Sequence, residues 1–348
     1  MLDFTSALYL GMRHPAAALA PWRSLTLGQP AALQEPPGAP ALAADLAALQ
    51  GCEAACLLPS TLHLFWDLFG MLAAERLVIL VDGGSYAIAR WGAERAQALG
   101  LPLRLFPSGE LAVLRRLVAA WAGQGRRPLI LADGYVPGSE RAPPLPAYAA
   151  IARQGGGMLL LDDTQVLGVS GAQGGGSARR HGLRGGHDDQ GGHLLIGASL
   201  AKGFGVPLAV LAGSASLLRR FEAHSQTRVH ASPPSAAVLA AARRALALNA
   251  AHGDALRARL AARVAQWRAG MAAAGICCRG GRFPVQRLPG CAHLRDGLRD
   301  AGVLALAQTG GRAGALTFLL RAEHTPRQLE EAMDLLEHHM RRRYERRI

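Results

Sequence analysis

Short apolar runs alternate with helical patterns from about residue 50 onward. The runs fall at 54–58, 76–81, 128–132 and 158–161, and each ends at polar or turn residues. Strands that are buried on both faces of a parallel sheet read as continuous apolar runs, and helices connect them. The helical patterns that separate the runs lie near 61–75, 85–99, 110–122 and 145–154. The chain is therefore expected to form an α/β domain with a mostly parallel central sheet.

Two further apolar runs, at 193–196 and 208–212, follow each other without a helical pattern between them. Parallel neighbours need a long crossover connection, usually through a helix, so a short connection favours an antiparallel pair. We expect this pair to complete the same sheet.

The last third of the chain has a different pattern. After Pro233 and Pro234, an alanine- and arginine-rich helical pattern continues to about residue 274, too far for a helix within the sheet layers. Weaker strand patterns follow near 283–287 and 315–320, and an amphipathic helix is expected at 326–340.

These patterns predict three parts. Residues 1–49, rich in proline and alanine, are expected to form an arm that packs on the small domain. Residues 50–233 form the large α/β domain, and residues 234–348 a smaller α+β domain.

Composition narrows the expected partners and location. The 348 residues carry a formal net charge of +13, but the arginines are spread along the chain and only 341–347 is a dense run. A solvated helix end explains that run, so we expect no nucleic-acid partner. No stretch approaches roughly eighteen apolar residues and no signal-peptide pattern is present, which predicts a cytoplasmic protein with no membrane span.

The cysteines and histidines do not indicate a metal site. An odd number of cysteines, five, favours free thiols in a reducing compartment. Cys291 and His293 match no standard zinc spacing. The histidines of the glycine-rich stretch 171–192 are typical of a surface loop, so no metal is expected.

Lys202 is the single lysine among 38 lysine and arginine residues. Arginine stays protonated at any workable pH, whereas a desolvated amine can lose its proton and act as a nucleophile. Imine formation with a carbonyl compound needs that nucleophile, and pyridoxal 5'-phosphate (PLP) is a common cofactor held in this way. The alternative is a chance leftover of an arginine-biased composition.

Polar residues at the ends of the expected strands support the first reading. Asp162 and Asp163 end one run, and the next run leads to Ser199 and Lys202. Ligands of open α/β sheets sit beyond the carboxyl ends of the strands, so these groups can reach one crevice. A carboxylate there could keep a pyridine nitrogen protonated, although such pairs are also common as helix caps.

A phosphate site is expected at the start of the helical pattern 61–75, which follows the first apolar run at 54–58. Ser60, Thr61 and Leu62 lie between a strand and a helix, where free backbone N–H groups and the helix dipole attract anions. Ser199 could add a hydroxyl to the same phosphate. Each serine could equally be an ordinary turn or cap.

These motifs resemble those of the PLP-dependent α-oxoamine synthases, which include 8-amino-7-oxononanoate synthase and 5-aminolevulinate synthase. The segments that carry the likeness are Leu161-Asp-Asp-Thr-Gln-Val-Leu-Gly-Val-Ser-Gly171 and Ser199-Leu-Ala-Lys-Gly-Phe-Gly205. Supporting matches are the "YLG" segment at 9–11, Asp133-Gly-Tyr135 and Ala322-Glu-His-Thr325. The likeness covers most of the chain.

The resemblance implies a fold-type I PLP-dependent transferase of the aminotransferase class I/II fold, usually a homodimer with its active sites at the subunit interface. Lys202 would form the imine with PLP and move protons, and Asp162 would hold the pyridine nitrogen. Ser60, Thr61, Leu62 and Ser199 would bind the phosphate. Ser232 looks like the residue that reaches the phosphate of the partner subunit.

Several positions depart from the family pattern. Tyr86 replaces the histidine that stacks on the cofactor ring, and tyrosine can still stack. Gln165 replaces the histidine of the "DDAHG" segment; it can donate to the phenolic oxygen of the cofactor but cannot act as an acid or base. Pro137 replaces a serine that often contacts the site, and the family's substrate loop is not recognisable in 27–40.

Ala315 occupies the position where the family has its carboxylate-binding arginine, and Thr317 occupies the position of a second family arginine. A bidentate arginine gives both affinity and orientation for a carboxylate. Arg312 or Arg321 could substitute, with a structural role as the alternative for each.

Three hypotheses follow. The first is a biosynthetic acyltransferase that condenses an amino acid with an acyl thioester of coenzyme A or acyl-carrier protein. The second keeps PLP but changes the reaction to transamination, racemisation or C–C cleavage. The third is a degenerate relative that serves as a binding subunit, which would have no reason to keep Lys202.

Overall fold

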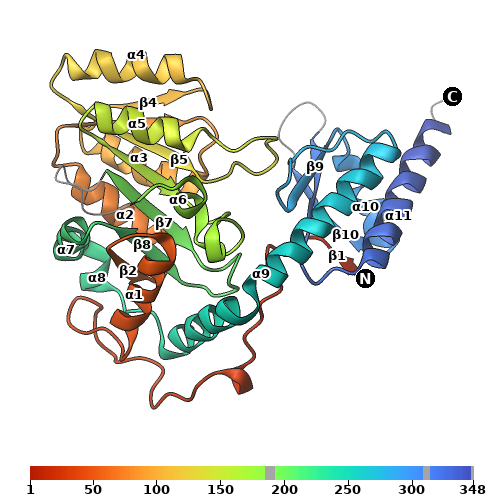
Figure 1. Ribbon diagram of the computed structural model, residues 1–348, viewed down its shortest axis with the longest axis horizontal. Helices are drawn as coiled ribbons and strands as arrows, with labels where there is room; N and C mark the ends of the chain where they lie inside the picture. The colour runs from red at the N-terminus through yellow and green to blue at the C-terminus, as the bar shows by residue number, and fades with distance from the viewer. Residues whose placement is uncertain (185–192, 309–313, 346–348) are drawn as a thin grey trace. The chain divides into compact units, whose positions relative to one another are not determined.

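The computed structural model describes residues 1–184, 193–308 and 314–345 (Figure 1). The chain forms two compact units. The large unit consists of Arg13–Val136 and Ala142–Ala251, and the small unit of Met1–Met12, Pro137–Arg141 and His252–Ile348. The three-part division at residues 49 and 233 stays a prediction.

The large unit is built on a sheet that has, in the described residues, the strand order β2-β8-β7-β6-β5-β3-β4. Neighbours from β7 to β4 are parallel, and β8 is antiparallel to both β7 and β2. The mostly parallel sheet and the antiparallel β7–β8 pair are therefore confirmed. The strand bounds are β2 Ala54–Leu58, β3 Leu77–Asp82, β4 Leu103–Phe106, β5 Arg127–Asp133, β6 Met158–Asp162, β7 Leu194–Ser199 and β8 Ala209–Gly213.

The apolar pattern of the sequence did not predict strand β4. It lies at the edge of the sheet, with Arg104 and Leu105 exposed, so its residues do not form a continuous apolar run. The pattern that reveals strands buried on both faces does not reveal an edge strand.

Helices cover both faces of the sheet (Figure 1). Ile79 and Val81 pack in one cluster with α2, α3 and α7, whereas Val78 and Leu80 pack in another with α4, α5 and α6. Side chains of a strand alternate between faces, so the apolar runs supply both cores. The helix bounds are α2 Thr61–Leu72, α3 Ala87–Ala98, α4 Leu111–Ala122, α5 Leu145–Gln154, α6 Gly176–His181 and α7 Ala215–His224.

Three more helices belong wholly or partly to the large unit. Helix α1 (Ala39–Gln50) packs on β2 and β8, and the short α8 (Gln226–His230) contacts α2. The long helical pattern is confirmed as α9 (Ala236–Ala273), and the boundary between the units falls inside it. Short 3-10 helices lie at Ala16–Ala18 and Ala172–Gly174.

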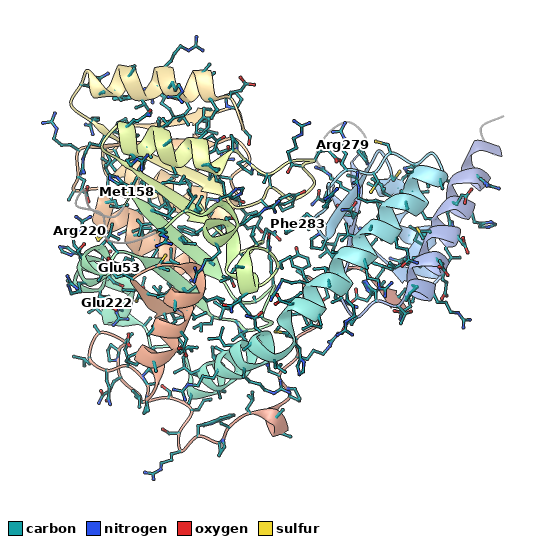
Figure 2. All side chains as sticks on the ribbon, viewed as in Figure 1. Glu53, Met158, Arg220, Glu222, Arg279 and Phe283 are labelled. Atoms are coloured by element: carbon teal, nitrogen blue, oxygen red, sulfur yellow. The ribbon has the colours of Figure 1, made fainter. Side chains whose placement is uncertain are left out.

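The small unit has its own core. Phe4, Trp267 and Phe318 pack together, with ring centroids 4.6 to 5.8 Å apart. Phe283, which Figure 2 labels, lies edge-on to Tyr9, and the ring centroids are 5.8 Å apart. The expected strands and C-terminal helix are confirmed as β9, β12 and α11. The bounds are β1 Leu2–Asp3, β9 Val285–Pro289, β10 Val303–Leu304, β11 Leu306–Gln308, β12 Ala315–Leu319, α10 Arg295–Asp300, α11 Pro326–Glu345 and a 3-10 helix Ala292–Leu294.

Strand β12 lies between β11 and β9 in an antiparallel sheet, and β1 pairs in parallel with β10. Among the residues that the structure describes, no helix is both long and apolar enough to cross a membrane.

Candidate active site

The carboxyl ends of three neighbouring strands bring the candidate residues of the large unit together. Asp133 at the end of β5 lies in register with Asp162 at the end of β6, and Asp162 lies in register with Gly197 of β7. Parallel strands end at the same edge of a sheet, so the turn after β7 places Lys202 beside both carboxylates.

Lys202 is held in a partly buried position between charges and a ring. Burial lowers the pKa of its amine, and the Asp162 and Asp133 carboxylates act in the opposite direction. Its Nζ lies 5.9 Å from the centre of the Tyr86 ring. An amine with a lowered pKa is deprotonated more often at neutral pH, which makes it a better nucleophile.

Asp162 is buried, with 5% of its surface exposed. Burial raises the pKa of its carboxyl, while hydrogen bonds from Thr164 and the charge of Lys202 counteract that rise. The Thr164 backbone N–H donates to Asp162 Oδ1 over 3.1 Å. A buried carboxylate with few donors is suited to a cationic or N–H partner, such as a protonated ring nitrogen.

Asp133 is a second buried carboxylate near Lys202, and it was not among the site residues expected from the sequence. It accepts a hydrogen bond from the Tyr86 backbone N–H at 3.1 Å, which fixes the start of α3. Burial, followed by the charge of Asp162, raises its pKa well above the ordinary value. Its place at a strand end, in the same position as Asp162, was the signal that could have identified it.

Asp163 has a different environment from its neighbour. Its carboxylate accepts hydrogen bonds from the Ser177 backbone N–H, at 2.7 Å, and from the Ser177 hydroxyl. Burial raises the pKa of Asp163 to about 6, although the Ser177 bonds oppose this. This half of the Asp-Asp pair therefore anchors α6.

The expected phosphate site lies at the start of α2. Ser60 is the N-cap, and its Oγ accepts from the His63 N–H at 3.4 Å and lies 2.8 Å from His63 Nδ1. A Cβ atom added to Gly197 of β7 would lie 3.1 Å from Leu64, so this turn packs closely on the strand next to Asp162. Thr61 and Leu62 form the first turn of the helix.

A family model described as aminotransferase class I and II matches residues 141–336. The chain belongs to this family. Among the curated relatives, the 8-amino-7-oxononanoate synthase of Thioalkalivibrio sulfidiphilus is 30% identical over 272 residues, which are 75% of this chain and 64% of the relative. That of Paracidovorax citrulli is 31% identical over 278 residues, 78% of this chain and 66% of the relative. The matched part of the chain thus spans just under two thirds of the length of each of these relatives.

Solved structures of low sequence identity share the fold. The serine palmitoyltransferase of Sphingomonas wittichii has a TM-score of 0.86 at 18% identity, with 97% of this chain and 87% of that chain covered. The 8-amino-7-oxononanoate synthase of Francisella tularensis has a TM-score of 0.78 at 17% identity, with 99% of both chains covered. The resemblance to the α-oxoamine synthases and the fold-type I architecture are confirmed.

The remaining candidates of this aminotransferase-family chain lie as follows. Tyr86 is 56% exposed next to Lys202. Gln165 is partly buried, three residues after Asp162. Ser199 Oγ accepts from the Ala201 N–H at 3.2 Å, which caps the turn that leads to Lys202. Ser232 is exposed in the segment between α8 and α9.

The structure describes one of the two arginine candidates. Arg321 belongs to the small unit, where Nη1 lies 3.1 Å from Asp3 Oδ2 and Nε lies 2.9 Å from Glu323 Oε1. These ion pairs give Arg321 a structural role there. Arg312 lies outside the described residues. Ala315 is buried on β12, as is Thr317.

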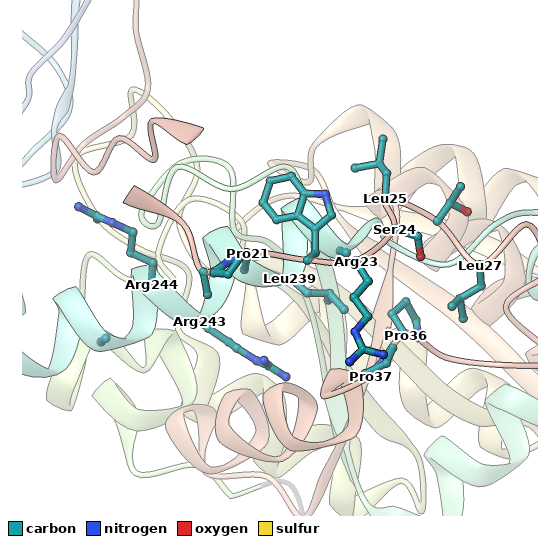
Figure 3. A pocket seen from close by; sticks show the side chains of 16 residues that line it. Pro21, Arg23, Ser24, Leu25, Leu27, Pro36, Pro37, Leu239, Arg243 and Arg244 are labelled. Carbon is teal, nitrogen blue, oxygen red and sulfur yellow. The ribbon is translucent and has the colours of Figure 1, made fainter. Parts of the chain in front are cut away.

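A cavity of about 780 Å³ in the large unit lies between residues 20–37 and α9 (Figure 3). Trp22, Leu25 and Leu239 give it an apolar lining, to which Arg243 and Arg244 add charge. None of the residues grouped around Lys202 lines it.

Proposed function

We propose that the protein is a PLP-dependent enzyme of the α-oxoamine synthase type that condenses an amino acid with an acyl thioester. The observation that carries this proposal is the placement of the single lysine beside two buried strand-end carboxylates. The names of the curated relatives support the reaction type.

The residues present fit the cofactor. Lys202 supplies an amine whose pKa is lowered by burial, and Asp162 supplies a buried carboxylate. Tyr86 offers an exposed ring beside Lys202. The N-cap Ser60 and the first-turn residues Thr61 and Leu62 have backbone N–H groups that precede the intrahelical hydrogen-bonding pattern and can bind a phosphate.

PLP, when bound, supplies an electron sink for negative charge at the α-carbon of an amino acid. Lys202 would hold it covalently and, once released by the substrate, move a proton at that carbon. Asp162 would keep the ring nitrogen protonated, and Tyr86 would stack on the ring. Gln165 would donate to the phenolic oxygen.

A second candidate keeps PLP but has another reaction, such as transamination, racemisation or C–C cleavage. Ala315 is buried on β12, and Arg321 is paired with Asp3 and Glu323. The arginine expected for an amino-acid carboxylate is therefore not supplied by either position, which favours a change in substrate handling. The buried carboxylate and lysine of the electron-sink site are unaffected.

We further propose a cytoplasmic homodimer with active sites at the subunit interface, with Ser232 reaching the phosphate of the partner subunit. The five cysteines are free, which supports a reducing compartment. The fold of the solved relatives and the exposure of Ser232 support the dimer.

The test is spectroscopic and chemical. Purified protein with PLP is expected to absorb in the visible range, and borohydride should bleach the colour and fix the cofactor to Lys202, as read by peptide mass spectrometry. Lys202→Arg keeps the charge but cannot form the imine, so it should remain unlabelled. Wild-type protein that stays colourless would contradict both candidate reactions.

Product analysis then separates the two. Amino acids are supplied with and without acyl-coenzyme A or acyl-carrier-protein thioesters. Ketone products that appear only with a thioester support condensation, whereas keto acids, racemised amino acids or aldehydes without a thioester support the second candidate.

A further inference from the structure

Thr164 connects the two halves of the proposed site. Its backbone N–H donates to Asp162 Oδ1 at 3.1 Å, and a hydrogen bond from its side chain lowers the pKa of the same carboxylate. Its Oγ1 also accepts a hydrogen bond from the Ser199 backbone N–H at 3.0 Å. A hydroxyl has one hydrogen to donate, so while its oxygen accepts from Ser199 that hydrogen is directed at Asp162.

The end of the β6–β7 ladder explains why a hydroxyl is needed there. The Asp163 N–H still donates to the Gly197 carbonyl at 2.8 Å. The next N–H on that side of β7, two residues further, is that of Ser199. Strand β6 ends at Asp162, and the Thr164 hydroxyl takes the place of a backbone acceptor. Thr164 therefore links the start of the turn that carries Lys202 to the Asp162 carboxylate.

The contact depends on a residue that departs from the family segment. The "DDAHG" segment that the chain resembles has alanine at this position, whereas this chain has Asp162-Asp163-Thr164-Gln165. A methyl group can neither accept from Ser199 nor donate to Asp162.

We propose that Thr164 is a positioning residue whose hydroxyl orients the Asp162 carboxylate toward the ring nitrogen of the cofactor and ties it to the turn that carries Lys202. The inference deepens the proposed function and rests on it for the identity of the bound group. The hydrogen-bonded link itself does not depend on that identity.

Removal of the Thr164 hydroxyl is expected to lower the pKa of Lys202. The side-chain bond from Thr164 lowers the pKa of Asp162 against the effect of burial, so without it Asp162 is neutral more often, although the backbone bond remains. Less negative charge then faces the Lys202 ammonium, and the pKa of Lys202 falls further. Among the described residues, the other groups near this pair are Asp133, which also supports the ammonium, Asp163, whose pKa the charge of Asp162 raises, and the Tyr86 ring.

The single lysine makes this measurable in PLP-free protein. Acetic anhydride labels Lys202 and the N-terminal amine, and peptide mass spectrometry separates the two. The midpoint of the pH–rate profile for Lys202 in Thr164→Val is expected to fall by roughly one pH unit. Thr164→Ser, which keeps the hydroxyl, should match wild type. Thr26→Val is the matched control, because Thr26 is an exposed loop residue that accepts only locally, from Gly28 N at 3.2 Å.

A Thr164→Val profile that coincides with wild type, in protein with a native circular dichroism spectrum, would overturn the proposal. If the valine variant does not fold, Thr164→Ala, the residue of the resembling family, gives the same comparison. PLP titration adds a second readout, in which Thr164→Val should raise the dissociation constant roughly tenfold. Wild-type protein that binds no PLP would refute the proposed function and leave the labelling result to decide the role of Thr164.

Discussion

The environment of each carboxylate in the large unit follows from where its strand places it. Asp162 and Asp163 are adjacent and both buried, but Asp162 accepts from Thr164, two residues further along the chain, whereas Asp163 accepts from Ser177 of α6. Successive residues of an extended chain point to opposite sides, so one side chain faces Lys202 and the other faces α6. Two identical neighbours in the sequence therefore have different surroundings: Asp163 anchors α6, and Asp162 is the one we propose for the cofactor.

Asp163 gives a pH-dependent contribution to stability. Its pKa is raised from 3.8 to about 6 in the folded protein, so the folded state binds a proton at a pH where the unfolded chain does not. The free energy of unfolding contributed by this group should therefore rise as the pH falls from about 6 to about 4, by about 3 kcal/mol. Asp163→Asn should remove this part of the pH dependence in urea titrations, whereas Asp45→Asn, at an exposed helical position, should keep it. Identical pH dependences for wild type and Asp163→Asn would refute the assignment.

At the scale of elements, short helices depend on contacts from longer ones. Helix α8 has five residues, and isolated helices of that length are unstable in water. Asp67 of α2 is buried and accepts hydrogen bonds from the Thr227 N–H, at 3.1 Å, and from the Thr227 hydroxyl, at 2.6 Å. It also accepts from the hydroxyl of Ser225, the N-cap of α8. The first turn of α8 is thus held by a carboxylate from another helix.

Asp67→Ala should lower the free energy of unfolding by about 3 kcal/mol, because several buried donors lose a charged acceptor at once. Chemical denaturation with circular dichroism measures this change, and Asp45→Ala on the exposed face of α1 serves as the control. A loss no larger than that of the control would show that water replaces the carboxylate.

At the scale of the whole molecule, the large unit contains both the lysine and the carboxylates that face it. The small unit holds the position where the family carries a substrate arginine. In the proposed function, the absence of an arginine at position 315 therefore leaves the lysine and carboxylates of the large unit unchanged.

The proposed dimer predicts complementation between defective chains. Lys202→Ala destroys the imine in its own chain, and Ser232→Asp should repel the phosphate of the partner's site. If Ser232 acts across the interface, a mixed dimer has one site with both defects and one with neither. Co-refolded equal mixtures should regain about a quarter of the wild-type sites, measured as borohydride-fixed PLP, while each variant alone regains almost none. Sedimentation that shows dimers without such recovery would mean that Ser232 does not act in the partner's site.

The sequence by itself was sufficient to predict the buried strands, the helices between them, the antiparallel β7–β8 pair and the family. Each of these depends on local apolar pattern or on a short motif. The edge strand β4 was not predicted, because half of its residues face water. Helix α1 lies in a stretch where the sequence indicated only an arm.

The tertiary structure decided what surrounds the lysine. The pairing of Asp133 with Asp162, the attachment of Asp163 to Ser177 and the link from Thr164 to Ser199 join residues 14 to 35 positions apart in sequence. Such contacts depend on strand register and on where each strand ends, and no local pattern encodes either. The sequence could thus identify Lys202 as the single lysine and predict Asp162 near it, but the contributions of Asp133 and Thr164 became identifiable only in the folded sheet.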